Sequence, residues 1–163
     1  MLSVKMTDKI HWIGVNDRTT DLFEGMWPIS GEGVSYNSFA IDDEKKALVD
    51  LAKAFKTDEY LERIAAVFPL ERLEYIIINH TEPDHTGALP LLCRLAPAVR
   101  IFCTAKAKEM LQSFYGLGDR CTAVEDGQTL SLGKHTLEFR LTPFLHWPDT
   151  MMTYAVEDQV LFS

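Results

Sequence analysis

The sequence predicts one mixed α/β domain, in which helices cover a mixed sheet or a pair of sheets. Three features of the 163-residue chain support this prediction. Strand-like segments fill the first 50 residues, strand and helix patterns alternate through the middle, and strand patterns return in the last third. A purely parallel, doubly wound sheet fits this order less well, because it requires strands and helices to alternate throughout.

The N-terminal part predicts a β-hairpin. Residues 9–15 (KIHWIGV) and 34–41 (VSYNSFAI) are rich in β-branched and aromatic residues, as strands are. Residues 46–50 (KALVD) predict the return strand of the hairpin, and DDEK supplies its turn.

The middle of the chain predicts alternating helices and strands. Helical spacing of apolar residues begins at Thr57 and stops at Pro69. Residues 75–78 (YIII) are short and wholly apolar, which indicates a strand covered on both faces. A second helix is expected after Gly87. The apolar faces of the two helices consist of Leu61, Ile64, Ala65 and Phe68, and of Leu91, Leu92 and Leu95.

One more strand–helix unit precedes the C-terminal strands. Residues 99–103 (VRIFC) predict a strand, and Thr104 caps a helix that ends at Gly116. DGQTLSLG and VEDQV then predict turns between strands. The final QVLFS stops in what resembles the middle of a buried strand, so we expect residues 1–163 to be part of a longer protein.

Composition is ordinary for a globular protein and argues against several kinds of partner. The net charge is −8 and the pI about 5.0, whereas nucleic acids and anionic membranes recruit basic surfaces. No apolar run is as long as a membrane span, and the N-terminal sequence lacks the pattern of a secretory signal. The cysteines are too scattered for a disulfide framework or a thiolate zinc site, so we expect buried thiols and a cytoplasmic location; they are Cys93, Cys103 and Cys121.

The stretch NHTEPDHTG, directly after YIII, places four potential metal ligands within six residues. In an extended segment His80, Glu82 and Asp84 would point to the same side, and Pro83 would keep that spacing stiff. His85 breaks the alternation, but a turn here can bring it round to a second metal. Two carboxylates packed against a core repel each other unless cations compensate, so the loop predicts a metal site rather than a solvated acidic turn.

A second loop, TPFLHWPDT, offers His146 at another strand-to-loop junction. Mixed imidazole and carboxylate ligands suit zinc, iron or manganese, and the anionic oxygen of Glu82 favours iron over the imidazole-rich site of a zinc hydrolase. Three imidazoles and two carboxylates are too many for one tetrahedral metal and predict a dinuclear site; they belong to His80, Glu82, Asp84, His85 and His146.

Four other residues receive no metal role. His11 and His135 lie in ordinary strand patterns and are interpreted as structural or exposed. Tyr36 and Trp147 are interpreted as core residues, with the wall of a small gas pocket as the alternative.

These motifs resemble those of a known family. A His-x-[His/Glu]-x-Asp-His motif after an apolar strand, with a later histidine, is similar to that of the metallo-β-lactamase superfamily. The form with glutamate, HTEPDHTG, followed by LHWPDTM, resembles the flavodiiron proteins, also called rubredoxin:oxygen oxidoreductases. LFEGMWP and GVSYNSFAI are also similar to the N-terminal region of that family, so the resemblance extends over essentially the whole chain.

The resemblance implies an αββα sandwich, of which residues 1–163 would form the N-terminal part. It implies that His80, Glu82 and His146 hold one iron, and that Asp84 and His85 hold the other. A bridging aspartate and a further histidine are expected after Ser163, and so is a flavodoxin-like domain that binds FMN.

The resemblance also implies a function. The diiron site would reduce dioxygen to water or nitric oxide to nitrous oxide, with electrons passing from rubredoxin or a similar carrier through FMN in a head-to-tail homodimer. Two alternatives stay open. One is a dinuclear zinc hydrolase on the same scaffold, and the other is a catalytically incomplete fragment, because two expected ligands and the flavin lie outside the chain.

Overall fold

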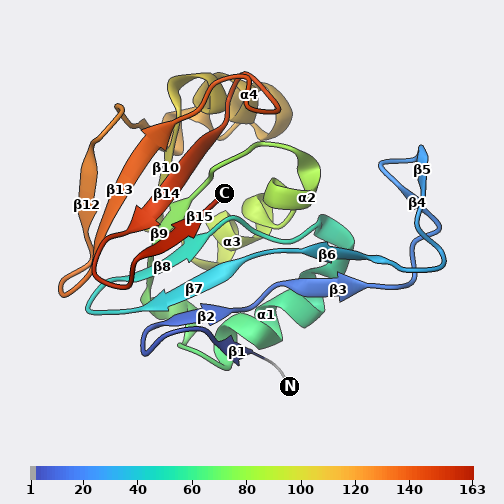
Figure 1. Ribbon diagram of the computed structural model, residues 1–163, viewed down its shortest axis with the longest axis horizontal. Helices are drawn as coiled ribbons and strands as arrows, with labels where there is room; N and C mark the ends of the chain where they lie inside the picture. Colours follow the sequence, from blue (N-terminus) through green and yellow to red (C-terminus); the bar gives the residue numbers. More distant parts are fainter. Residues whose placement is uncertain (1–2) are drawn as a thin grey trace.

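The computed structural model describes residues 3–163, which form two stacked β-sheets with helices against the outer face of the larger sheet (Figure 1). The larger sheet has seven strands and the smaller has four. The mixed α/β class predicted from the sequence is therefore confirmed. The described residues contain three layers, in the order helices, sheet, sheet, of the expected four-layer sandwich.

The elements have the following bounds. The seven-stranded sheet contains, in spatial order, β1 (Val4–Lys5), β2 (Ile10–Trp12), β7 (Phe39–Asp42), β8 (Lys46–Val49), β9 (Leu73–Ile77), β10 (Arg100–Cys103) and β11 (Cys121–Ala123). The four-stranded sheet contains β12 (Thr129–Ser131), β13 (Thr136–Leu141), β14 (Met151–Ala155) and β15 (Val160–Phe162). Two short ribbons pair β3 (Val15–Asp17) with β6 (Val34–Tyr36), and β4 (Leu22–Phe23) with β5 (Trp27–Pro28). The α-helices are α1 (Thr57–Ala65), α2 (Pro83–Thr86), α3 (Leu89–Leu95) and α4 (Ala105–Tyr115), and 3₁₀ turns occupy Ala54–Lys56, Leu70–Arg72 and Gly118–Arg120.

The seven-stranded sheet is mixed. Strands β1, β2, β7 and β8 pair antiparallel, and the β7–β8 pair is the predicted hairpin. Strands β8, β9, β10 and β11 pair in parallel. Because parallel strands end at the same edge of a sheet, the segments that follow β8, β9 and β10 meet there.

Strand β9 lies inside the seven-stranded sheet and is covered on both faces. Ile76 and Ile78 pack in the core between the sheet and the helices, whereas Tyr75 and Ile77 pack in the core between the two sheets. All four side chains are at most 5% exposed. The prediction that YIII is covered on both faces is confirmed.

Two predicted strands are each divided in two. The segment 9–15 forms β2 and β3, and the segment 34–41 forms β6 and β7, because the paired chains leave the large sheet and continue as a ribbon (Figure 1). Gly14 lies at the first break, where an added Cβ would stand 2.3 Å from the Tyr36 carbonyl oxygen. Only glycine permits this close approach of the two chains.

The three predicted helices are present. Helix α4 begins as expected, with the Thr104 hydroxyl accepting the N–H of Ala107 at 3.0 Å, and it ends at Gly116 with φ 68°. The short helix α2 was not predicted. Pro83 occupies its first position, where a missing N–H costs nothing, so the chain turns where an extended segment was expected.

The C-terminal strands differ from prediction in two details. DGQTLSLG contains strand β12 as well as turns, whereas VEDQV forms the turn between β14 and β15 as predicted. Strand β15 lies at the edge of the four-stranded sheet, with Leu161 55% exposed and Phe162 buried. The expected buried strand is therefore present but is buried on one face only.

Two further expectations concern single residue types and membrane spans. All three cysteines are buried and free, as the sequence predicts. Within residues 3–163, every helix is too short or too polar to cross a membrane.

Candidate metal centre

Three loops meet where the parallel strands end. One follows β9 and carries NHTEPDHTG, one follows β8, and one joins β13 to β14 and carries His146. The Met151 N–H donates to the Asn79 carbonyl at 2.9 Å, and the Thr153 hydroxyl donates to the Asn79 side-chain oxygen at 2.7 Å. Asn79 therefore holds β14, and with it the third loop, against the end of β9.

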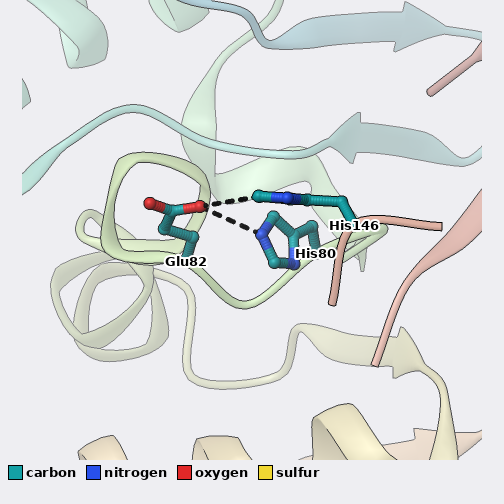
Figure 2. Close-up of side chains that lie close together, drawn as sticks. All are labelled: His80, Glu82 and His146. Atoms are coloured by element: carbon teal, nitrogen blue, oxygen red, sulfur yellow. Dashed lines mark hydrogen bonds and ion pairs between the residues drawn. The ribbon is translucent and has the colours of Figure 1, made fainter. Parts of the chain in front are cut away.

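Glu82 faces two imidazoles (Figure 2). Its Oε2 lies 3.2 Å from Nε2 of His80 and 3.3 Å from Nε2 of His146. A metal–nitrogen bond of about 2.1 Å places neighbouring ligand atoms about 3.0–3.4 Å apart. Among residues 3–163, these three are the only group of histidine, cysteine and acidic side chains whose ligand atoms converge on one point. The trio has the spacing of ligands to a single metal.

His80 is oriented by a buried carboxylate. Its Nδ1 lies 3.2 Å from Oδ2 of Asp149, so the opposite nitrogen, Nε2, points at Glu82. Burial alone would lower the pKa of His80, but the hydrogen bond to Asp149 and the charge of that carboxylate raise it above its ordinary value. The carboxylates therefore create a negative electrostatic potential at His80, which favours a cation, either a proton or a metal ion.

Asp84 is not part of an extended segment, contrary to the arrangement predicted from the sequence. It lies in the first turn of α2, and its Oδ2 is 3.7 Å from Nε2 of His85. Burial and the negative charge of Glu82 raise the pKa of Asp84, although the charge of His85 opposes them. Its Oδ1 is buried and has no hydrogen-bond partner among residues 3–163.

His85 stands beside the trio, since its ring centroid is 5.2 Å from that of His80. Its Nδ1 lies 3.5 Å from Oδ2 of Asp50, a separation too long for a well-aligned hydrogen bond. Burial would lower the pKa of His85, but its contact with Asp50 and the charges of Asp50, Asp84 and Glu82 raise it to about 9. Asp84 and His85 thus form a second histidine–carboxylate pair next to the trio.

His146 reaches the site from a strained loop. Its φ is 110° and that of Phe144 is 64°, both in the region that side chains other than glycine rarely adopt. Such backbone costs on the order of 1–3 kcal/mol per residue and concentrates at functional sites. The His146 side chain is 62% exposed, so burial does not explain the strain.

Buried side-chain atoms without hydrogen-bond partners in residues 3–163 indicate that this group of residues can bind a metal ion. Within the part of the chain that the structure describes, the buried side-chain atoms without a hydrogen-bond partner include three at this site, which are Asp84 Oδ1, His85 Nδ1 and Asp149 Oδ1. Uncompensated buried polar atoms are rare, because each costs free energy. A cation beside Asp84 would compensate Asp84 Oδ1, whereas His85 Nδ1 faces Asp50.

A pocket of about 280 Å³ opens beside the trio. Its apolar wall includes Leu145, Met151 and Met152, and the imidazoles of His80 and His146 also line it. Neither Tyr36 nor Trp147 lines this pocket. Tyr36 is 1% exposed and donates its hydroxyl hydrogen to Asp17, and the Trp147 ring packs edge-on against His80, with 4.9 Å between the ring centroids.

The sequence analysis did not identify two carboxylates that lie beside the histidines. Asp149 lies only three residues after His146, and Asp50 directly follows β8. A carboxylate at the end of a buried strand was a usable signal for Asp50, since ligands gather at that edge. Its φ of 49° aims a buried side chain at Asn79 and His85.

The layered sheets and this loop arrangement define a metallo-β-lactamase-like domain. Residues 34–163 match the family profile described as "ODP family beta lactamase". The chain therefore belongs to this family, whose fold here is that of the metallo-β-lactamase-like domain of flavodiiron proteins.

The flavodiiron protein of Giardia intestinalis superposes with a TM-score of 0.92 at 38% identity, covering 100% of this chain and 40% of that one. The chain is 37% identical to the nitric oxide reductase of Moorella thermoacetica over 97% of its length. It is 36% identical to the rubredoxin-oxygen oxidoreductase of Megalodesulfovibrio gigas over 100% of its length. The chain spans about 40% of the length of both enzymes.

Proposed function

We propose that this chain is the N-terminal portion of the diiron domain of an oxidoreductase that reduces dioxygen to water, nitric oxide to nitrous oxide, or both. The convergence of His80, Glu82 and His146 on one point carries the proposal. The names of two relatives, a nitric oxide reductase and a rubredoxin-oxygen oxidoreductase, support the reaction class.

The proposed ligand assignment follows the two groups in the structure. His80, Glu82 and His146 would hold one iron, and Asp84 and His85 would hold the second. The iron pair, when bound, would supply the redox chemistry. The ring centroids of His80 and His85 are 5.2 Å apart, so the two groups are close enough for neighbouring metals.

The surrounding side chains suit a small diatomic substrate. The pocket beside the trio has an apolar wall formed by Leu145, Met151 and Met152, which suits a small apolar gas, although polar residues also line it. Glu82 supplies a hard anionic oxygen in place of a third imidazole, and this favours iron over zinc.

The remaining parts of the proposal concern partners. We propose that FMN, bound outside residues 1–163, passes electrons to the site from rubredoxin or a similar carrier. The name of the Megalodesulfovibrio gigas relative supports the donor, and the flavodiiron name of the Giardia intestinalis relative supports the flavin and the two irons. We further propose a cytoplasmic homodimer.

Anaerobic expression of the natural gene product, with whatever sequence follows Ser163, tests the proposal. We expect about two irons and one flavin per chain, and rapid consumption of O2 or NO when reduced rubredoxin is supplied. Stoichiometric zinc, esterase or lactamase activity and no flavin would instead establish the zinc hydrolase. Absence of bound metal would establish a catalytically incomplete protein.

A further inference from the structure

We propose that Asp149 is a positioning residue that fixes the orientation of His80 and anchors the loop that carries His146. The inference rests on the proposed function, since it concerns two ligands of the same iron. It adds a residue that touches neither the metal nor the substrate.

The first observation is the set of contacts at the carboxylate. Asp149 is fully buried, and its Oδ2 accepts hydrogen bonds from the Thr81 N–H and the Thr81 hydroxyl, both at 2.8 Å. The same oxygen lies 3.2 Å from Nδ1 of His80. One oxygen therefore ties the His146 loop to the two residues that directly precede Glu82.

The second observation concerns the proton on His80. An ionised carboxylate has only acceptor atoms, so Nδ1 of His80 must carry the hydrogen that faces Asp149. In the neutral imidazole Nε2 then has a free lone pair, and Nε2 is the atom that faces Glu82. Asp149 thus selects the tautomer in which His80 presents a ligand atom to the metal.

The third observation concerns the backbone of the loop. The carbonyl oxygen of Asp149 accepts a hydrogen bond from the Thr104 hydroxyl at 2.9 Å. That hydroxyl also caps the N-terminus of α4 by accepting the N–H of Ala107 at 3.0 Å. Asp149 is therefore joined through its backbone to α4 and through its side chain to the metal loop. Because His146 has a φ of 110°, the loop needs such an anchor to keep its conformation.

The fourth observation concerns the negative charge of Asp149. All three donors are served by Oδ2, whereas Oδ1 is buried and has no hydrogen-bond partner within residues 3–163. An asparagine could accept the same hydrogen bonds through one oxygen without a buried charge. The negative charge of an aspartate increases the basicity of the His80 ligand, which the neutral amide of an asparagine would not do.

The test uses Asp149→Asn and Asp149→Ala in the full-length natural protein loaded anaerobically with ⁵⁷Fe. We expect Asp149→Asn to lower iron affinity about 10–100-fold, the range for such supporting carboxylates. In Mössbauer spectra one of the two iron signals should shift while the other stays in place. A merely structural residue would not move one signal selectively.

The matched control is Asp43→Asn, which makes the same change at a buried aspartate bound to a histidine, His135, away from the metal loops. It should leave iron affinity and both Mössbauer signals unchanged. If Asp149→Asn does not fold, Thr81→Val decides the matter, because it removes one donor to Asp149 and should weaken iron binding less than tenfold with the same selective shift.

Three outcomes separate the claims. Failure of the unmodified protein to bind iron would overturn the proposed function. Normal iron binding by the unmodified protein, with unchanged affinity and spectra in Asp149→Asn, would overturn only the role of Asp149. A uniform shift of both iron signals would also overturn that role, because it would indicate general distortion.

Discussion

Two histidines, His80 and His135, each lie between two carboxylates, and strand β8 separates their surroundings. Asp43 precedes β8 and contacts His135, whereas Asp50 follows β8 and lies among the metal loops. The group around His80, which we call the metal-loop cluster, consists of the side chains of His80, Glu82, Asp84, His85 and His146. The group around His135, which we call the turn cluster, consists of the side chains of Asp43, His135 and Asp158.

The turn cluster is closed upon itself. Nδ1 of His135 lies 2.9 Å from Asp43 Oδ2, and Nε2 lies 2.9 Å from Asp158 Oδ2. The His135 N–H also donates to Asp43 at 2.7 Å, so the cluster joins turns from both sheets. The carboxylates stand against opposite nitrogens of one ring, and no single point faces all three side chains. The same residue types thus form an ion-pair network here.

The metal-loop cluster contains the same residue types as the turn cluster, but its ligand atoms point toward one another differently. Nitrogen atoms from two different imidazoles converge on Glu82 Oε2, and a neighbouring carboxylate and imidazole have buried atoms without hydrogen-bond partners in residues 3–163. The turn cluster also contains a buried atom without a hydrogen-bond partner among the described residues, Asp158 Oδ2, so the convergence of ligand atoms, and not the count of ligand-type residues, distinguishes the metal site from a salt bridge.

The largest effect is expected from Glu82→Ala. This change removes the oxygen on which His80 and His146 converge, so we expect iron affinity to fall by more than about 100-fold, beyond the loss typical of supporting residues. Metal analysis after gel filtration measures it. Glu157→Ala, at a glutamate that accepts the Thr136 N–H near the turn cluster, is the control and should keep full iron content. Full iron content in Glu82→Ala would remove the central ligand from the assignment.

Metal removal should affect stability next. A ligand at 100 times its dissociation constant stabilises the folded state by about 2.7 kcal/mol. At about 2–4 °C per kcal/mol for a chain of this size, chelation of the unmodified protein should therefore lower its melting temperature by about 5–11 °C. The Glu82→Ala variant should show a much smaller change in the same thermal melts. Equal changes in both proteins would show that the bound metal is elsewhere.

Asp43→Asn should destabilise the fold without changing metal content. The substitution weakens charge-assisted hydrogen bonds to His135 that connect the two sheets, so we expect a loss of about 1.5–3 kcal/mol in the free energy of unfolding. Denaturant titration measures this value, and iron analysis supplies the second readout. Loss of iron in this variant would contradict the separation of the two clusters.

The same variant should show a defined pH dependence. Burial would raise the pKa of Asp43, but the hydrogen bonds from His135 outweigh it and hold the pKa below its ordinary value near 4. A carboxyl whose pKa is depressed on folding contributes stability above about pH 4, and that contribution is lost as the pH falls through the folded-state pKa. The difference in unfolding free energy between the unmodified protein and Asp43→Asn should therefore shrink below about pH 4. A constant difference would contradict the charge-assisted contact.

Asp158→Asn should have the smallest effect. The contact of Asp158 with His135 is an ion pair, and Asp158 Oδ2 makes no aligned hydrogen bond within residues 3–163. We expect a loss of about 0.5–1 kcal/mol, as is usual for ion pairs near the surface. A double variant with Asp43→Asn, measured by denaturant titration, should show that the two effects couple through the shared imidazole. A loss as large as that of Asp43→Asn would mean that both carboxylates hold His135 equally.

Local sequence patterns predicted the layered mixed fold, whereas the grouping of His80 and Glu82 with His146, 64 residues from Glu82, came from the resemblance to the flavodiiron proteins. YIII had to be a buried strand, and the spacing from His80 to Glu82 fixed two ligands next to its end. The extended arrangement predicted for Asp84 was wrong, because Pro83 begins a helix as readily as it stiffens an extended segment. Asp149 was missed because its importance depends on a contact 68 residues away, which no local pattern encodes. Asp50 contacts Asn79, 29 residues away, but its place at the end of a buried strand was a usable local signal.

Anomalous diffraction at the iron edge, on crystals of the full-length protein loaded anaerobically, tests the contrast between the clusters most directly. We expect one iron peak within bonding distance of His80, Glu82 and His146, a second beside Asp84 and His85, and none at His135. A peak at the turn cluster, or no peak at Glu82 in a protein that contains iron, would contradict the assignment of the metal site.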